Sequence, residues 1–187
     1  SDPDDVFAAS ARCDELGLDT ISAGGPIAWA MECVERGLID APWLKFGDGA
    51  ALLRALDMIG SREPGLGELL ALGSRAAAGV VGHGSIDFAP QVKGLELPGY
   101  EPRSLQSMAL GLAVNARGAD HNRSGAYEAD LRDGLDRVHG TAEHVAFLPL
   151  GRPLTTAMGM MLLASAHVAG WPVVKGGSQA LADAMAK

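Results

Sequence analysis

Two carboxylates flank a glycine–leucine step near the start of the chain, in the run DELGLD at residues 14–19. A helix that ends at Gly17 would present Asp14 and Asp19 beside a turn. A carboxylate accepts two parallel hydrogen bonds from an edge of adjacent N–H donors, and the aminopyrimidinone ring of a pterin has such an edge. The same residues also fit an ordinary helix C-terminus followed by an Asx turn. The run therefore predicts either a heterocycle site or a plain turn.

A second polar run, RGADHNR, occupies residues 117–123. Arg117 and Arg123 supply fork-shaped donors that suit phosphate, and Gly118 allows backbone N–H groups to approach an anion. The imidazole of His121 could take or give a proton. The run suits a dianionic cofactor tail together with a proton-transfer step. A polar connection held by arginine–aspartate pairs is the alternative.

Helices interrupted by glycine are expected to position both runs. Asp2 is expected to cap and Pro3 to open the first helix, which ends at Gly17, and the chain restarts over residues 22–26. Ser104 is expected to cap the helix that leads into the second run. The other expected helices span residues 27–36 and about 66–78, and one begins after Asp48 and ends before Pro64. Residues 79–103 indicate a long irregular segment, with short extended pieces at 80–81, 92–93 and 95–97.

These elements predict a mainly α fold, with multihelical, bundle-like domains, a long irregular segment and at most short strands. The chain has 187 residues, of which 48% are hydrophobic and 20% charged, as is typical of a globular protein. Its net charge of -8 argues against a nucleic-acid partner, because binding to phosphates needs a basic face.

Two cysteines, Cys13 and Cys33, are too few for a disulfide framework, and their spacing does not match zinc or iron–sulfur ligands. A reduced, cytoplasmic setting is therefore expected, and the N-terminus shows no signal-peptide pattern. Residues 157–174 are apolar enough to suggest a membrane span, but His167 and Pro172 favour a buried helix. No association with a membrane is expected.

The first polar run continues into a longer pattern that resembles a known family. Three stretches carry the resemblance: CDELGLDTISAGGPIAWAMECVERGLI, LKFGDGAALLRALDMIGSREPGLGELLALGSRAAA and VKGLELPGYEPRSLQSMALGLAVNARGADHNRSGAYEADL. They look like the aldehyde ferredoxin oxidoreductase family over about residues 2–147. The matching part of those enzymes consists of the two helical domains that close over a tungsten or molybdenum bis-pterin cofactor.

The resemblance implies both an activity and a set of site residues. The activity is two-electron oxidation of an aldehyde to a carboxylate, with electrons passed to an iron–sulfur cluster and then to ferredoxin. His121 would be the acid–base candidate near the metal. Six residues would contact pterin: Asp14, Leu18 and Asp19 on one side, and Arg117, Gly118 and Arg123 on the other.

Several parts of that family's pattern are missing from this sequence. The first, β-rich domain is absent, as is the Cys-x-x-Cys-x-x-x-Cys run that ligates the cluster, and Cys13 and Cys33 do not replace it. The second acidic-x-x-Gly-Leu motif, which completes the other pterin site, is absent too. The enzyme interpretation therefore requires a partner chain or a missing domain.

After about residue 147 the sequence resembles a different family. The stretches RPLTT, HVAGWPV and GGSQALADA resemble flavin-dependent oxidoreductases of the phytoene-dehydrogenase type. The flavin fingerprint G-x-G-x-x-G is absent, so FAD binding is not expected. We interpret residues 1–147 as an aldehyde ferredoxin oxidoreductase-like helical region and residues 148–187 as a flavoenzyme-like helical segment. The alternatives are a catalytically silent helical composite or designed protein without cofactor, and a fragment of an FAD oxidoreductase.

Overall fold

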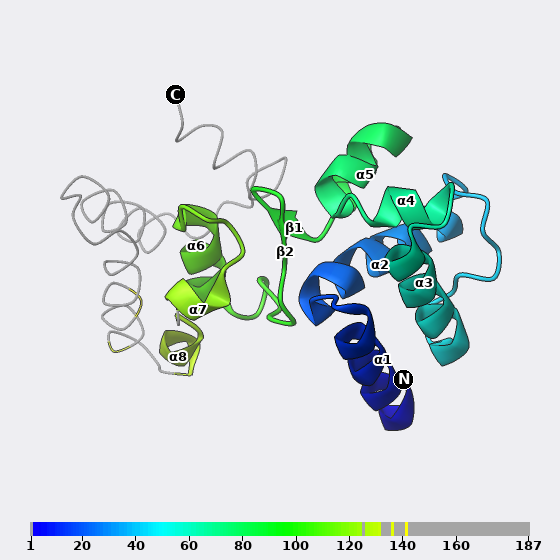
Figure 1. Ribbon diagram of the computed structural model, residues 1–187. Helices are drawn as coiled ribbons and strands as arrows, with labels where there is room; N and C mark the ends of the chain where they lie inside the picture. Colours follow the sequence, from blue (N-terminus) through cyan, green and yellow to red (C-terminus); the bar gives the residue numbers. More distant parts are fainter. Residues whose placement is uncertain (1, 125, 132–135, 137–140, 142–187) are drawn as a thin grey trace. The chain divides into compact units, whose positions relative to one another are not determined.

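The computed structural model describes residues 2–124, 126–131, 136 and 141 (Figure 1). Helices dominate these residues, and the strands among them form one two-stranded hairpin, so the expected mainly α fold is confirmed. The chain divides into two compact units, Ser1–Glu96 and Leu97–Lys187, and each is considered by itself. The elements expected beyond residue 141, including the apolar stretch at 157–174, lie outside the described residues.

Helix α1 (Pro3–Leu16) begins and ends where its sequence predicts. Asp2 caps its N-terminus through a side-chain hydrogen bond. At its C-terminus Gly17 has a φ of 68°, and the Leu18 N–H donates to the carbonyl oxygen of Cys13 at 2.8 Å. These are features of a Schellman motif, whose left-handed residue is adopted by glycine without strain. The turn that follows α1 is therefore encoded locally.

Helix α2 (Thr20–Glu35) begins earlier than its sequence suggests, so the expected restart over residues 22–26 is wrong. The Asp19 side chain accepts a hydrogen bond from the Ser22 N–H at 2.7 Å and caps the helix. The helix then runs through two glycines and Pro26, which is buried. Cap and burial together outweigh the poor helix propensity of these residues.

Helix α3 (Gly49–Ser61) packs against α1 (Figure 1). Asp48 caps it, as predicted, by accepting a hydrogen bond from the Ala51 N–H at 3.0 Å. Ala55 and Leu56 lie on its buried face. The helical spacing of the apolar residues in this segment thus predicts both the helix and the face that it buries.

The single helix expected over residues 66–78 is wrong, because the chain forms two helices there. Helix α4 spans Leu66–Leu70 and helix α5 spans Ser74–Val81. Gly73, between them, has a φ of 82°, which no helix can contain. Residues 80–81, expected to be extended, form the end of α5.

The segment after α5 contains more regular structure than expected. A short 3-10 helix, η1, spans Ser85–Phe88. Strands β1 (Gln91–Val92) and β2 (Leu95–Glu96) then pair antiparallel, with Gln91 opposite Glu96. These strands lie within one residue of the extended pieces expected at 92–93 and 95–97.

The core of the first unit is centred on Trp29 of α2, which is 1% exposed. Its indole N–H donates to the carbonyl oxygen of Ser85 at 3.0 Å, and the Ser85 hydroxyl donates to the carbonyl oxygen of Ala78 at 3.2 Å. Trp29 therefore links α2 to η1 and, through Ser85, to α5. Other large side chains buried in this unit are Ile27, Leu44, Leu56 and Leu70.

Cys33 lies in the same core and has no exposed surface. Burial raises the pKa of its thiol from 9.0 to about 11, because the thiolate would lose its hydration. The folded state thus favours the neutral thiol, and this contribution to stability is complete below pH 9 and is lost as the pH rises towards 11. We expect the wild type to lose about 2 kcal/mol more unfolding free energy over this range than Cys33→Ala loses. Urea unfolding of both proteins at the two pH limits measures the difference, and equal losses would contradict the expectation.

The second unit contains α6 (Gln106–Val114), α7 (His121–Ser124) and α8 (Tyr127–Asp130). The expected capping of α6 by Ser104 is wrong. Instead, the Asp130 carboxylate accepts hydrogen bonds from two backbone N–H groups in the first turn of α6, both at 2.9 Å. Because α8 packs against α6, this carboxylate reaches N–H groups that no neighbouring side chain serves.

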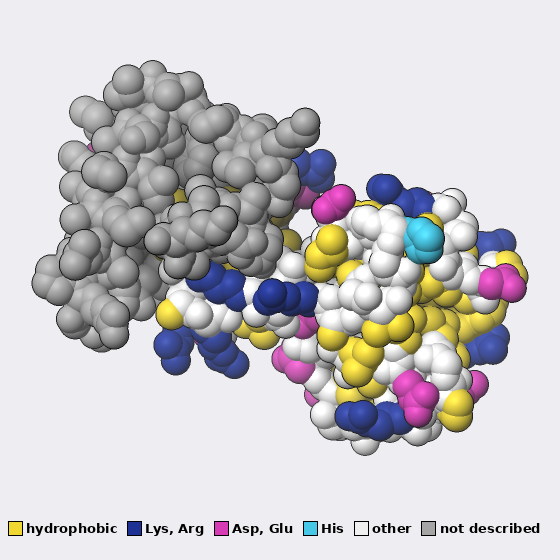
Figure 2. Space-filling model, turned by 90° about the horizontal axis from the view of Figure 1, so that it is seen from above, with side chains coloured by type: hydrophobic (Ala, Val, Ile, Leu, Met, Phe, Trp, Pro, Cys, Tyr) yellow, Lys and Arg dark blue, Asp and Glu magenta, His cyan; other side chains and the backbone are white. Residues whose placement is uncertain are grey.

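Charged side chains are spread over the visible face of the first unit, with hydrophobic side chains between them (Figure 2). The large hydrophobic residues that this unit exposes are Val6, Phe7, Phe46, Leu72, Val80 and Ile86. Within the described part of the chain, no helix combines the length and the apolar character needed to cross a membrane.

Candidate functional site

Leu18 and Asp19 line a cavity of about 260 Å³ in the first unit. We call it the Asp19 cavity. Its remaining wall comes from α2, the end of α3, the turn between α4 and α5, and the hairpin: Ser22, Ala23, Ile59, Leu70, Ala71, Leu72, Gly73, Gly94 and Glu96. Asp14 does not line it, because this exposed residue lies on the last turn of α1. The turn after α1 therefore places one of its two aspartates in the wall of a cavity.

Asp19 already has a structural role in the wall of this cavity. One of its carboxylate oxygens, Oδ1, accepts the Ser22 N–H and caps α2. An ionised carboxylate has about four acceptor positions, so the capping bond does not preclude other hydrogen bonds. The sequence presents a turn and a heterocycle site as alternatives. The Asp19 side chain can serve both, because it caps α2 and also lines the cavity.

Glu96 brings a second carboxylate to the Asp19 cavity. Its Oε1 accepts hydrogen bonds from the Ser74 N–H at 2.8 Å and from the Ser74 hydroxyl at 3.1 Å. Because Ser74 begins α5, Glu96 caps that helix from the hairpin. The sequence does not indicate Glu96 as a site residue, since 22 residues separate it from Ser74 and no local pattern predicts the pairing.

In the second unit, the loop after α6 is organised by Asn115 and Asp120. The Asn115 side chain is 1% exposed, accepts the Arg117 N–H at 3.0 Å and donates to the Asp120 carbonyl oxygen at 3.1 Å. Gly118 has a φ of 98°, which allows the tight turn between them. The Asp120 carboxylate accepts the Asn122 N–H at 3.1 Å, at the start of α7. The loop is therefore shaped by buried amide and carboxylate groups.

Both arginines of this loop pair with the same buried carboxylate. Arg117 Nη1 lies 3.0 Å from Asp120 Oδ2, and Arg123 Nε lies 3.4 Å from the same oxygen. These are the arginine–aspartate pairs that the sequence offers as an alternative. The three residues together carry a net charge of about +1, and each guanidinium keeps N–H groups that no described residue accepts. An anion can still bind these remaining donors.

His121 begins α7 and lies in a small aromatic cluster. Its ring centroid is 5.7 Å from that of Tyr100, which in turn stacks on Tyr127 at 5.5 Å. The imidazole is half-buried. Ring contacts of this kind fix the plane of the imidazole.

The seven predicted site residues thus fall into two groups in different units. Leu18 and Asp19 share a cavity in the first unit, with Asp14 on the neighbouring helix. The four residues from the run 117–123 lie in the second unit, Arg117 and Gly118 in the loop after α6 and His121 and Arg123 in α7. Asp120, which orders that loop, is not among the predicted site residues. Its spacing of three residues from each arginine is the sequence signal for these ion pairs. The assignment of both groups to a cofactor stays a prediction.

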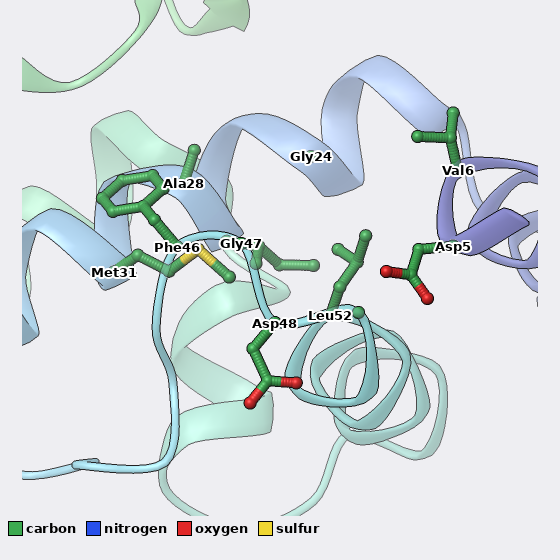
Figure 3. A pocket seen from close by; sticks show the side chains of 11 residues that line it. Asp5, Val6, Gly24, Ala28, Met31, Phe46, Gly47, Asp48 and Leu52 are labelled. Atoms are coloured by element: carbon green, nitrogen blue, oxygen red, sulfur yellow. The ribbon is translucent and has the colours of Figure 1, made fainter. Parts of the chain in front are cut away.

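A second cavity of the first unit, of about 190 Å³, lies between α1, α2 and α3 (Figure 3). Its charged residues are Asp5 and Asp48, and no predicted site residue lines it. The rest of the lining is mainly apolar: Val6, Ile27, Ala28, Met31, Phe46 and Leu52, with Gly24, Gly47 and Gly49. This cavity offers a hydrophobic surface without a candidate for acid–base or redox chemistry.

Direct ligation of a metal ion does not fit the described side chains. They contain no group of three or more His, Cys, Asp and Glu residues that could hold one. Cys13 and Cys33 are buried free thiols, and burial raises the pKa of both, which disfavours the thiolate form that a metal–sulfur bond requires. The two carboxylates of the Asp19 cavity do fit the amino edge of a heterocycle.

Comparison with known proteins points to one family. The family model described as "Aldehyde ferredoxin oxidoreductase, domains 2 & 3" matches residues 1–171 and so continues past residue 147. The tungsten-containing aldehyde ferredoxin oxidoreductases of Pyrococcus furiosus and Thermococcus kodakarensis are 43% and 42% identical to this chain over 122 residues. These matches cover 62% of this chain and 20% of each relative.

A third relative carries a different name. The aliphatic sulfonate oxidoreductase, WOR-like subunit, of Pyrococcus furiosus is 33% identical over 138 residues, which is 68% of this chain and 22% of that protein. The chain thus spans about a fifth of the length of the curated relatives that it matches.

Proposed function

Because the chain belongs to the aldehyde ferredoxin oxidoreductase family, we propose that it forms part of the seat for a tungsten–pterin cofactor. The enzyme would oxidise aldehydes to carboxylates and pass the electrons to ferredoxin, in line with the names of the two tungsten-containing relatives. Molybdenum is the alternative metal.

The Asp19 cavity is the observation that supports this proposal. Asp19 and Glu96 line it, and carboxylates are the natural acceptors for the adjacent N–H donors of an aminopyrimidinone ring. Leu18 adds an apolar surface for the ring. Asp14 is the weaker member of the set, because it does not line the cavity.

Residues 117–123 are proposed to supply further contacts to the cofactor. Arg117 and Arg123 would hold its phosphate with the N–H groups that their pairing with Asp120 leaves over, and Gly118 would let the backbone approach. His121 would accept, at an imidazole nitrogen, a proton released as the aldehyde is oxidised. The bound cofactor would supply the two-electron oxidation itself.

The iron–sulfur cluster of the family is proposed to take its ligands from residues outside this chain, since Cys13 and Cys33 are both buried. A partner chain or a further domain would supply these ligands and the second pterin site. A cytoplasmic location belongs to the same proposal.

Residues 148–187 carry a separate proposal, that of a flavoenzyme-like helical segment joined to the region at 1–147. The family match to residue 171 favours instead a continuous family sequence over much of this segment. The absorbance spectrum of the purified protein distinguishes a flavoenzyme-like segment from a continuous family sequence at residues 148–187. Bound FAD would support the flavoenzyme segment, and pterin without flavin would support the family.

Metal and pterin content test the proposed function directly. The protein would be purified from a host supplied with tungstate and molybdate, then subjected to elemental analysis and to fluorescence of the released, oxidised pterin. Near-stoichiometric metal with pterin is the expected result, and the metal found decides between tungsten and molybdenum. A folded protein with neither would overturn the proposal and leave a catalytically silent helical protein.

Asp19→Asn should lower the pterin content about tenfold while the stability hardly changes. Asparagine caps a helix as well as aspartate does, so α2 keeps its start, whereas loss of the charge weakens the hydrogen bonds to the amino edge. Asp48→Asn is the matched control, because Asp48 caps α3 in the same way but does not line the Asp19 cavity. Similar pterin contents in the two variants would argue against a role for Asp19 in binding.

A further inference from the structure

Glu96 presents an unused acceptor at the wall of the Asp19 cavity. Its side chain is 5% exposed, and both hydrogen bonds that it receives from Ser74 end on Oε1. Among the described residues no donor reaches Oε2. A buried carboxylate oxygen without a donor is costly, so Oε2 requires either water or a ligand N–H from the cavity.

Close contacts hold this carboxylate in place. A Cβ atom added at Gly25 would lie 2.5 Å from Glu96 Cγ, so the backbone of α2 packs directly against the side chain. A Cβ atom at Gly73 would lie 3.0 Å from Oε1. With α2 on one side and the start of α5 on the other, Glu96 has little freedom to turn away. The carboxylate of Glu96, which lines the cavity, is therefore held in a fixed position.

We propose that Glu96 is a specificity-determining residue of the Asp19 cavity and that its Oε2 accepts a hydrogen bond from the exocyclic amino group of an aminopyrimidinone ligand. This inference rests on the proposed function, because it concerns the ring that the Asp19 cavity would hold.

The chemistry of the amino group explains why two carboxylates are useful. One of its N–H bonds lies parallel to the neighbouring ring N–H, and this pair suits Asp19. The other N–H points away and needs a second acceptor, which Glu96 supplies. A ring with a carbonyl oxygen in place of the amino group would bring that oxygen, an acceptor, against the Glu96 carboxylate, which is also an acceptor. The cavity should therefore reject it.

Equilibrium dialysis of the full chain tests the inference with two probes, free pterin and lumazine. Lumazine keeps the bicyclic ring system but carries oxygen in place of the amino group. We expect the wild type to bind pterin at least about tenfold more tightly than lumazine, as one charge-assisted hydrogen bond allows.

Glu96→Gln should reduce pterin affinity about 10- to 100-fold and leave lumazine binding undiminished. The carboxamide can keep its oxygen on Ser74 and cap α5, but it places an NH2 group where Oε2 stood. If the wild type binds pterin and the variant binds it equally well, the inference is wrong and the proposed function stands. If the wild type binds no pterin, both are overturned.

A second pair of variants decides the question if Glu96→Gln does not fold. Gly25→Ala pushes against Glu96 Cγ, whereas a Cβ atom at the neighbouring Gly24 meets nothing within 4 Å. Loss of pterin affinity in Gly25→Ala, with wild-type affinity in Gly24→Ala, would support the role of Glu96. Equal affinity in the two variants would overturn it.

Discussion

Replacing Trp29 with alanine should lower the free energy of unfolding by about 3–5 kcal/mol, among the largest losses for a single side chain in the first unit. The indole is 1% exposed, so its removal leaves a cavity at the centre of the core. Its N–H bond to Ser85 also links α2 to η1, and without it the buried Ser85 carbonyl oxygen loses one of its donors. Urea unfolding followed by circular dichroism measures the loss.

Two further variants separate the contributions of Trp29. Trp29→Phe keeps an aromatic ring and removes the N–H, so it should cost about 1–3 kcal/mol. Phe7→Ala is the control, because Phe7 is 72% exposed and its removal should change stability by no more than about 0.5 kcal/mol. A loss in Trp29→Ala as small as that in Phe7→Ala would contradict the packing described for α2.

Gly67→Ala should cost about 1–3 kcal/mol, although it adds a single methyl group. A Cβ atom at this position would overlap the carbonyl oxygen of Met58. That oxygen accepts the Glu63 N–H at 2.9 Å at the end of α3, so it cannot move without breaking the turn into α4. The thermal unfolding midpoint should fall accordingly.

Gly79→Ala is the matched control for this helix–helix contact. Gly79 lies in α5, is exposed, and a Cβ atom there meets nothing within 4 Å. Alanine should therefore stabilise the protein by about 0.4–1 kcal/mol through its higher helix propensity. If both substitutions changed the midpoint in the same direction, the close approach of α4 to α3 would be wrong.

The helix ends that could be predicted from the sequence are those whose capping groups lie within a few residues of the ends. Asp2, Gly17 and Asp48 each act on backbone groups one turn away or less. Side-chain type and position are then sufficient, because no other element is needed to complete the bond. The mainly α fold follows from the same local signals.

The misplaced helix ends have causes that no local pattern contains. Helix α2 passes through two glycines and Pro26 because Ala23, Pro26 and Ile27 around them are buried in the unit. Helix α5 is capped by Glu96, and α6 by Asp130, from 22 and 23 residues along the chain. Such partners become neighbours only once the fold has formed.

The same division holds for the candidate site. The turn that brings Leu18 and Asp19 together is local, and the sequence indicates it. The cavity that they line depends on the hairpin and on the turn between α4 and α5, which the sequence does not place. Asp14 shares the motif with Asp19 but not the cavity, because the helix end lies between them.

The capping of α6 by Asp130 has a consequence for the order in which the protein is made. During synthesis from the N-terminus, the residues of α6 leave the ribosome before the carboxylate that completes its first turn. An isolated helix of this length is unstable in water, and its N-terminal N–H groups stay open until residue 130 has been added. Helices α6 and α8 are therefore expected to form together in one late step, once α8 can fold back onto α6.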